Sequence, residues 1–116
     1  MWAAELARTG SFEHDPSNED HGENLWMGTC GAFSLDHMIE GWSEEKAQLR
    51  RLSSWDRDHH AVGHYTQMVW KDTARVGCAM GRNREDEFLV CRYSPPGNVL
   101  GESPYAGGGM SLPDGV

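Results

Sequence analysis

The sequence predicts a single α+β domain. Residues 33–52 carry apolar side chains three and four positions apart, which is the spacing of an amphipathic helix. Residues 75–80 and 87–93 each alternate between the two faces of a strand, and a connection containing glycine and asparagine joins them, as in a β-hairpin. The 116 residues suffice for one domain with one core, and not for two.

The first expected element is a short helix. Alanine and leucine favour a helix over residues 2–9, and Gly10 follows where a helix end prefers glycine. Residues 11–24 are polar and contain Pro16 and Gly22, so they are expected to form a loop. An isolated helix of about two turns is marginal in water, so residues 2–9 need tertiary packing.

The clearest helix is predicted over residues 33–52, with Ser34 as its N-cap. At about 100° per residue, Glu45 lies about 60° from the centre of the apolar stripe, whereas Glu44 points away from it. We therefore expect Glu45 at the edge of the buried face and Glu44 in solvent. The stripe consists of Leu35, Met38, Ile39, Trp42, Lys46 and Leu49.

The segment "HYTQMVW", residues 64–70, fits either a helix or a strand. Its spacing suits a helical turn, but its β-branched and aromatic residues suit a strand, and so short a run cannot decide. His64 stands where this apolar segment begins. If this histidine is structural, one hydrogen-bond partner is enough for it. If it belongs to a functional site, it needs partner side chains from elsewhere in the chain.

The hairpin predicts a disulfide. If Met80 faces Leu89, then Cys78 faces Cys91, and directly opposed residues of two strands come close enough for a disulfide. In a reducing compartment the two would instead be small core residues. With three cysteines in the chain, Cys30 is expected to be a free thiol.

The composition argues against several classes of partner. The net charge is −8, and no run of basic residues is longer than Arg50–Arg51, so nucleic acid and anionic membrane surfaces are not expected partners. No stretch approaches the roughly 18 apolar residues of a membrane span. Residues 1–10 lack the basic start of a signal peptide, and Glu5 and Arg8 interrupt their apolar run.

Four motifs give the chain a family resemblance. "GENLW" at 22–26, "GHYTQMVW" at 63–70, "FLVCRYSPPGN" at 88–98 and "GESPY" at 101–105 follow one another in this order. Together they closely resemble the CAP superfamily of cysteine-rich secretory proteins, antigen 5 and plant pathogenesis-related protein 1. The resemblance implies an α-β-α sandwich with a small antiparallel sheet, a helix at "HYTQMVW" and an extracellular location.

The resemblance also sets the expected domain limits. It implies a CAP domain over residues 1–105, followed by a flexible glycine-rich tail over 106–116. The expected first helix is shorter than the first helix of the family. We therefore expect apolar surface to be exposed, with either self-association or low stability as the consequence.

The family cleft holds two histidines and two glutamates. Matched by motif, these are His64 of "GHYTQ", Glu23 of "GENL", Glu45 after the helix tryptophan, and His14 of "FEHDP". His21 is nearer to Glu23 in sequence and is the alternative to His14. Two imidazoles beside carboxylates predict a weak, non-obligatory site for zinc or another divalent cation.

Three functions remain open on these residues. The favoured one is a binding or effector module, because no nucleophile motif is present and CAP proteins vary widely in role. Its partners would be an unidentified protein or a lipid- or sterol-like ligand, since parts of the family bind sterols or fatty acids. One alternative is a metal-dependent hydrolase in which Glu23 or Glu45 activates water. The other is a structural domain with an inactive cleft.

Overall fold

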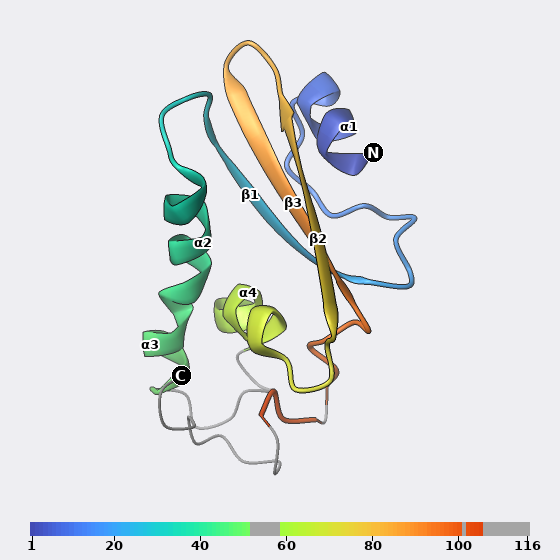
Figure 1. Cartoon of the computed structure of the whole chain (residues 1–116), viewed down its shortest axis with the longest axis vertical. Coiled ribbons are helices and arrows are strands. Elements are labelled where there is room, and N and C mark those ends of the chain that lie inside the picture. Colours follow the sequence, from blue (N-terminus) through green and yellow to red (C-terminus); the bar gives the residue numbers. More distant parts are fainter. Residues whose placement is uncertain (52–58, 101, 106–116) are drawn as a thin grey trace.

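A computed structural model describes residues 1–51, 59–100 and 102–105. The described chain contains both helices and an antiparallel sheet, which confirms the α+β class (Figure 1). None of its helices is both long and apolar enough to span a membrane. The elements are α1 (Trp2–Thr9), β1 (Gly22–Thr29), α2 (Leu35–Ser43), α3 (Glu45–Leu49), α4 (His59–Val69), β2 (Arg75–Arg82) and β3 (Asp86–Ser94).

The three strands form one antiparallel sheet in the order β1-β3-β2. In the hairpin, Met80 pairs with Leu89, which confirms the predicted register. The expectation of a loop over residues 11–24 was wrong at its end, because β1 already begins at Gly22. The polar residues 22–24 are extended because they pair with residues 91–93 of β3, a contact that local composition cannot reveal.

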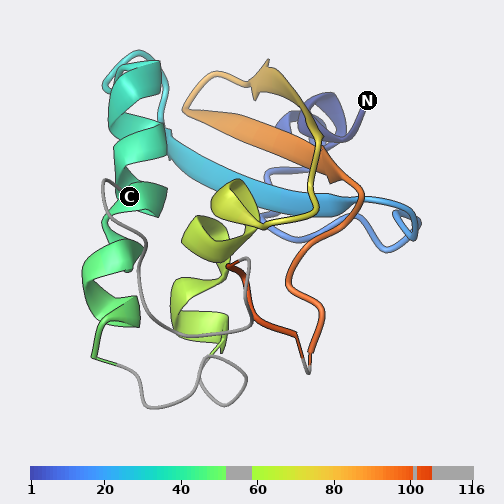
Figure 2. The ribbon, with the colours of Figure 1, turned by 60° about the horizontal axis from the view of Figure 1, so that its bottom comes forward.

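Helices cover both faces of the sheet (Figures 1 and 2). Side chains alternate along β3, so Phe88 and Val90 pack against Ala3, Leu6 and Ala7 of α1. The intervening residues of β3 turn to the opposite face and pack against α2 and α4. The resulting arrangement is the expected α-β-α sandwich. The contacts on this second face involve Met38, Trp42, Met68, Leu89, Cys91 and Tyr93.

One glycine allows α1 to lie close to the sheet. A Cβ atom on Gly81 of β2 would lie 2.1 Å from the backbone carbonyl oxygen of Ala3. No side chain fits in that space. Glycine at this position is therefore a condition for the packing of α1 against β2.

The helix predicted over residues 33–52 is two shorter helices. Ser34 caps α2 as expected, accepting a hydrogen bond of 3.0 Å from the His37 N–H. At Glu44 the backbone tightens, and the Ala47 N–H donates to the Glu44 carbonyl three residues back instead of four. Leu35 is 56% exposed and lies outside the buried stripe, because it occupies the first position of α2.

The segment "HYTQMVW" is helical up to Val69, as the resemblance implied. The chain after Ser94 packs back on α4, where the Thr66 hydroxyl donates to Asn98 Oδ1 over 2.6 Å. Farther along, the Tyr65 and Tyr105 hydroxyls lie 3.0 Å apart. The expected tail over residues 106–116 lies outside the described residues.

Candidate functional site

His14 and Glu23 form the first pair of the candidate site. Glu23 is the second residue of β1, and His14 lies in the loop before that strand. His14 Nδ1 lies 2.8 Å from Glu23 Oε1, and the Asp15 N–H donates to the same oxygen over 3.1 Å. The Glu23 side chain is 4% exposed and that of His14 is 66% exposed. A buried carboxylate therefore holds an accessible ring.

Arg92 connects this pair to the sheet. It lies opposite Glu23 in the strand register, and its Nε–H donates to Glu23 Oε2 over 3.1 Å. Its Nη2–H donates to Asp15 Oδ2 over 2.7 Å. The Ser17 hydroxyl and backbone N–H both donate to Asp15, and they lower the pKa of that carboxyl, with Arg92 acting in the same direction. The loop that carries His14 is thereby fixed to β3.

His64 and Glu45 form the second pair. Glu45 is the first residue of α3, and its Oε2 lies 2.8 Å from His64 Nδ1. Its other oxygen accepts a hydrogen bond of 3.0 Å from the Tyr65 N–H. Glu44 is exposed, so the structure brings Glu45, and not Glu44, to the histidine.

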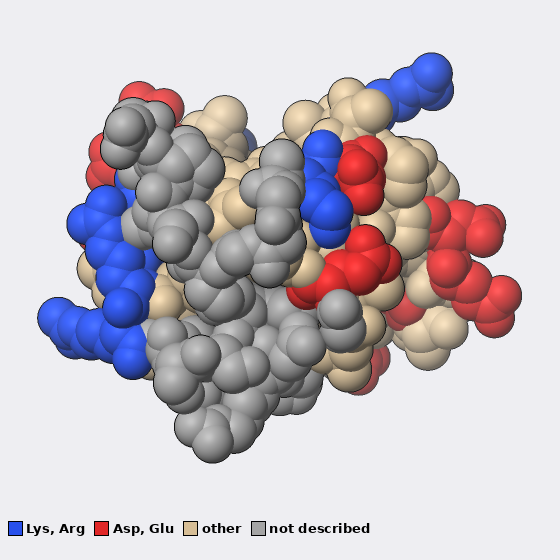
Figure 3. All heavy atoms as spheres, turned by 90° about the horizontal axis from the view of Figure 1, so that it is seen from below, with Lys and Arg blue, Asp and Glu red and all other residues tan. Residues whose placement is uncertain are grey.

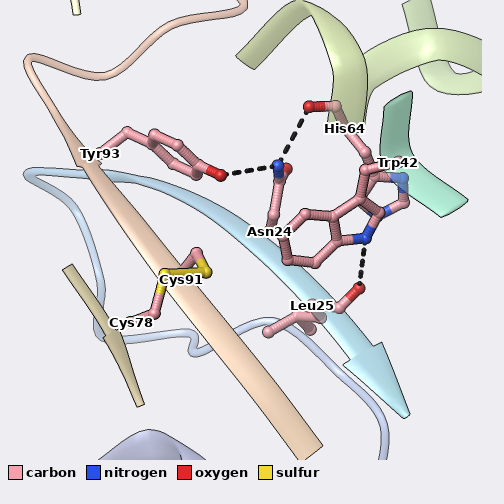
Figure 4. Close-up of a disulfide and its surroundings, with 7 residues drawn as sticks. All are labelled: Asn24, Leu25, Trp42, His64, Cys78, Cys91 and Tyr93. Carbon is pink, nitrogen blue, oxygen red and sulfur yellow. Dashed lines mark hydrogen bonds between the residues drawn. A yellow bond between two sulfur atoms is a disulfide. The ribbon is translucent and has the colours of Figure 1, made fainter. Parts of the chain in front are cut away.

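Two further side chains position His64. The Trp42 indole stacks on the imidazole with ring centroids 5.7 Å apart, and its Nε1–H donates to the Leu25 carbonyl (Figure 4). The Asn24 amide donates to the His64 carbonyl over 3.0 Å and to the Tyr93 hydroxyl over 3.1 Å. Burial raises the pKa of Tyr93, and the Asn24 hydrogen bond partly opposes that rise.

Both histidines therefore have the same arrangement. In each pair a glutamate carboxylate accepts a hydrogen bond from Nδ1–H, so Nε2 of the neutral ring carries the lone pair that could bind a ligand. This is how outer-shell carboxylates orient imidazoles that bind metals.

The two pairs are not drawn together into one cluster. Among the residues that the structure describes, no three His, Cys, Asp or Glu side chains lie close enough to hold a metal ion. A shared metal site at His14 and His64 therefore stays a prediction.

A pocket of about 280 Å³ lies at the start of β1, and His14, His21 and Glu23 line it together with Gln67 of α4. His21 thus shares this space with His14. It is His14, however, whose ring is held by the Glu23 carboxylate.

The predicted disulfide is present. Cys78 of β2 and Cys91 of β3 are directly paired across the hairpin, and their sulfur atoms are bonded (Figure 4). Cys91 is 1% exposed, whereas Cys78 is exposed. Cys30 is free, as expected.

The sequence interpretation missed several residues around the candidate site. Arg92, Asp15, Asn24 and the stacking role of Trp42 were not assigned to it. Arg92 could have been found from the strand register, but only by pairing β1 with β3. That pairing joins Glu23 to a residue 69 positions later.

Comparison with known proteins identifies the family of this chain. The profile of the family described as "CAP: Cysteine-rich secretory protein family" matches residues 1–93. The chain belongs to the CAP family. Pathogenesis-related protein 1C of Nicotiana tabacum is 37% identical to this CAP domain over 105 residues, covering 90% of this chain and 61% of the relative.

Pathogenesis-related protein PR-1 of Medicago truncatula is 36% identical over 108 residues, with the same coverage of 90% and 61%. This CAP domain thus spans about three fifths of the length of these relatives. Among solved structures, "Crystal structure of NaASP2 with Zn2+" superimposes with a TM-score of 0.68 at 26% identity, covering 89% of this chain and 60% of that one.

Proposed function

We propose that this CAP domain is a binding module that takes a divalent metal ion through Nε2 of His14 and of His64. The matched geometry of the two histidines carries the proposal. Each ring is held at Nδ1 by a glutamate over 2.8 Å, which fixes its orientation and its tautomer. The structural neighbour NaASP2, whose crystal structure was solved with Zn2+, shares this fold.

The position of α4 supports a shared ion. Gln67 of α4 lines the same pocket as His14, and His64 stands one helical turn before Gln67 on the same face of that helix. A shared ion would lie between this pocket and the His64 ring, since His64 itself is not among the described residues that line the pocket. Two neutral imidazoles without a thiolate are a modest donor set, so the expected affinity is weak to moderate.

The glutamates fit a supporting role better than a role in hydrolysis. Both Glu23 oxygens accept hydrogen bonds, one from His14 and Asp15 and the other from Arg92. Both Glu45 oxygens are engaged as well, by His64 and by the Tyr65 N–H. A carboxylate that must take a proton from water needs a lone pair directed at that water. These contacts favour the binding module over the hydrolase.

An apolar ligand has weaker support. A pocket beside α1 is lined by Met1, Trp2, Ala79 and Val90 among others, and its volume is about 240 Å³. Sites for small organic ligands usually measure roughly 300–1,000 Å³. A metal ion is therefore the better-supported ligand.

We place the module outside the cell. The Cys78–Cys91 bond persists in oxidising compartments, and the description of the matching family calls its members secretory. A protein partner recognised there stays part of the proposal.

Zinc titration by calorimetry tests the metal site. His64→Ala should abolish binding, and His14→Ala should weaken it about as much, because each variant removes one of two ligands. His21→Ala is the matched control, since its ring lies in the same pocket without a carboxylate partner among the described residues, and it should change little. Affinity should be lower at pH 5 than at pH 8, because protons compete with the metal for imidazole nitrogen.

Two results would contradict the shared site. If His64→Ala binds zinc as well as the parent chain, then His64 is structural. If His21→Ala loses binding while His14→Ala retains it, then the second ligand is His21.

A further inference from the structure

A third pocket, of about 320 Å³, lies where β2 and β3 meet the loop before β1. Six residues line it: His21, Arg75, Val76, Gly77, Arg92 and Ser94. Two arginines and a histidine thus face one space, and none of its described lining residues is Asp or Glu. This is unusual in a chain with 18 acidic and 10 basic residues.

The strand register brings the two arginines to one face of the sheet. Arg75 pairs with Ser94, and Gly77 pairs with Arg92, so all four positions lie on the same side. Gly77 has no side chain, and a Cβ atom built on it would meet nothing within 4 Å. The floor between the arginines is therefore open.

The two arginines differ in how far their charge is neutralised. Arg92 already donates to Asp15 and Glu23, which balance its charge. Arg75 makes no side-chain hydrogen bond or ion pair with any described residue. No described residue therefore neutralises the Arg75 guanidinium or occupies its donors, and Ser94 and His21 line the same concave site.

We propose that this pocket binds the phosphate group of a small phosphate monoester. A guanidinium presents its N–H groups in a fork that matches phosphate oxygens, and the hydroxyl and imidazole add donors for the remaining oxygens. The apolar pocket beside α1 shares Gly77 and Arg92 with this one, so the organic part of the ligand can contact Trp2 and Ala79 there. The net charge of −8 disfavours a long polyanion such as nucleic acid, which would meet acidic surface beyond the pocket.

The test is an NMR titration of the whole chain with phenyl phosphate and with inorganic phosphate. A chelator is present throughout, so that phosphate cannot bind through a metal ion and the result is independent of the proposed metal site. Phenyl phosphate should cause saturable amide shifts confined to residues 2, 75–79, 92 and 94. It should bind more tightly than inorganic phosphate, which lacks a group to contact Trp2 and Ala79.

Two variants show whether phosphate binds in this pocket or only through the general attraction of a positive charge. Arg75→Gln should weaken binding at least about tenfold, because it removes the charge-assisted hydrogen bonds. Arg84→Gln removes the same charge from an exposed residue between β2 and β3, and it should change the affinity less than twofold. Equal effects of the two variants, or shifts that do not saturate, would overturn the phosphate site. Equal affinity for the two phosphates would overturn the assignment to a monoester.

Discussion

His64 is held by side chains from three different elements. Glu45 of α3 binds its ring, Trp42 of α2 stacks on it, and Asn24 of β1 binds its backbone carbonyl. Each contact restricts a different motion, so the direction of Nε2 is fixed before any ligand arrives. Such preorganisation lowers the cost of binding.

Glu45→Gln tests this positioning. The glutamine keeps the size of the side chain but loses the charge that favours a proton on His64 Nδ1, so zinc affinity should fall about 10- to 100-fold. Glu44→Gln is the matched control one residue earlier, on an exposed side chain, and it should leave the affinity unchanged. Calorimetry at pH 8 compares the two. Equal affinities would mean that Glu45 does not orient the ring.

At the scale of elements, prediction succeeded where the decisive contacts are local. The hairpin register followed from two strands only a few residues apart, and the cap at Ser34 followed from α2 itself. The strand β1 was missed because its polar start becomes extended only through pairing with β3. The division at Glu44 was missed because the apolar stripe continues through it, so periodicity carries no sign of the break.

The residues of the candidate site also differ in whether the sequence could predict them. The position of Glu45 at the edge of the apolar face was visible in the sequence, because the apolar stripe continues from α2 into α3. Arg92 was not visible, since its role depends on two strands distant in sequence. Such a contact is set by tertiary structure and leaves no local pattern.

The packing of α1 on β2 gives a prediction at this scale. Gly81→Ala should lower the free energy of unfolding by about 1–3 kcal/mol, because its Cβ would displace the Ala3 backbone. Gly77→Ala in the same strand is the control, since a Cβ there meets nothing within 4 Å. Urea denaturation measures both. A Gly81→Ala variant as stable as the Gly77→Ala variant would show that α1 is not packed so closely.

The disulfide gives a second prediction for the hairpin. Its cysteines are 13 residues apart, and closing so short a loop stabilises a fold by roughly 2–4 kcal/mol. Thiol counting on unfolded, unreduced protein should find one free cysteine, and Cys78→Ser with Cys91→Ser should lower the urea midpoint. Cys30→Ser is the control and should leave the midpoint nearly unchanged. Three free thiols in oxidised protein would exclude the bond.

The surface of the whole molecule combines acidic charge with exposed apolar side chains. Acidic groups gather on the right of the face shown in Figure 3, and basic groups lie mainly on its left. Near the turn between β1 and α2, Met27 and Phe33 are each 41% exposed and Leu35 is 56% exposed. The charge keeps copies of the chain apart, whereas the apolar groups favour contact between them.

Self-association should therefore depend on salt. Raising the ionic strength screens the net charge of −8, so the apparent mass in sedimentation experiments should increase from low to high salt. Phe33→Ser with Leu35→Ser should suppress the increase, because these substitutions remove exposed apolar surface. A monomer at every salt concentration would contradict the expectation of self-association.

The strand β1 supplies neighbouring residues that support the two candidate histidines. Glu23 and Asn24 point to opposite sides of the sheet, and they support His14 and His64 respectively. A slip of β1 against β3 by a single residue would exchange the two side chains and break both supports at once. If the proposed metal site is correct, metal affinity also reports on strand alignment, because a chain paired out of register would lose both supports and bind zinc poorly.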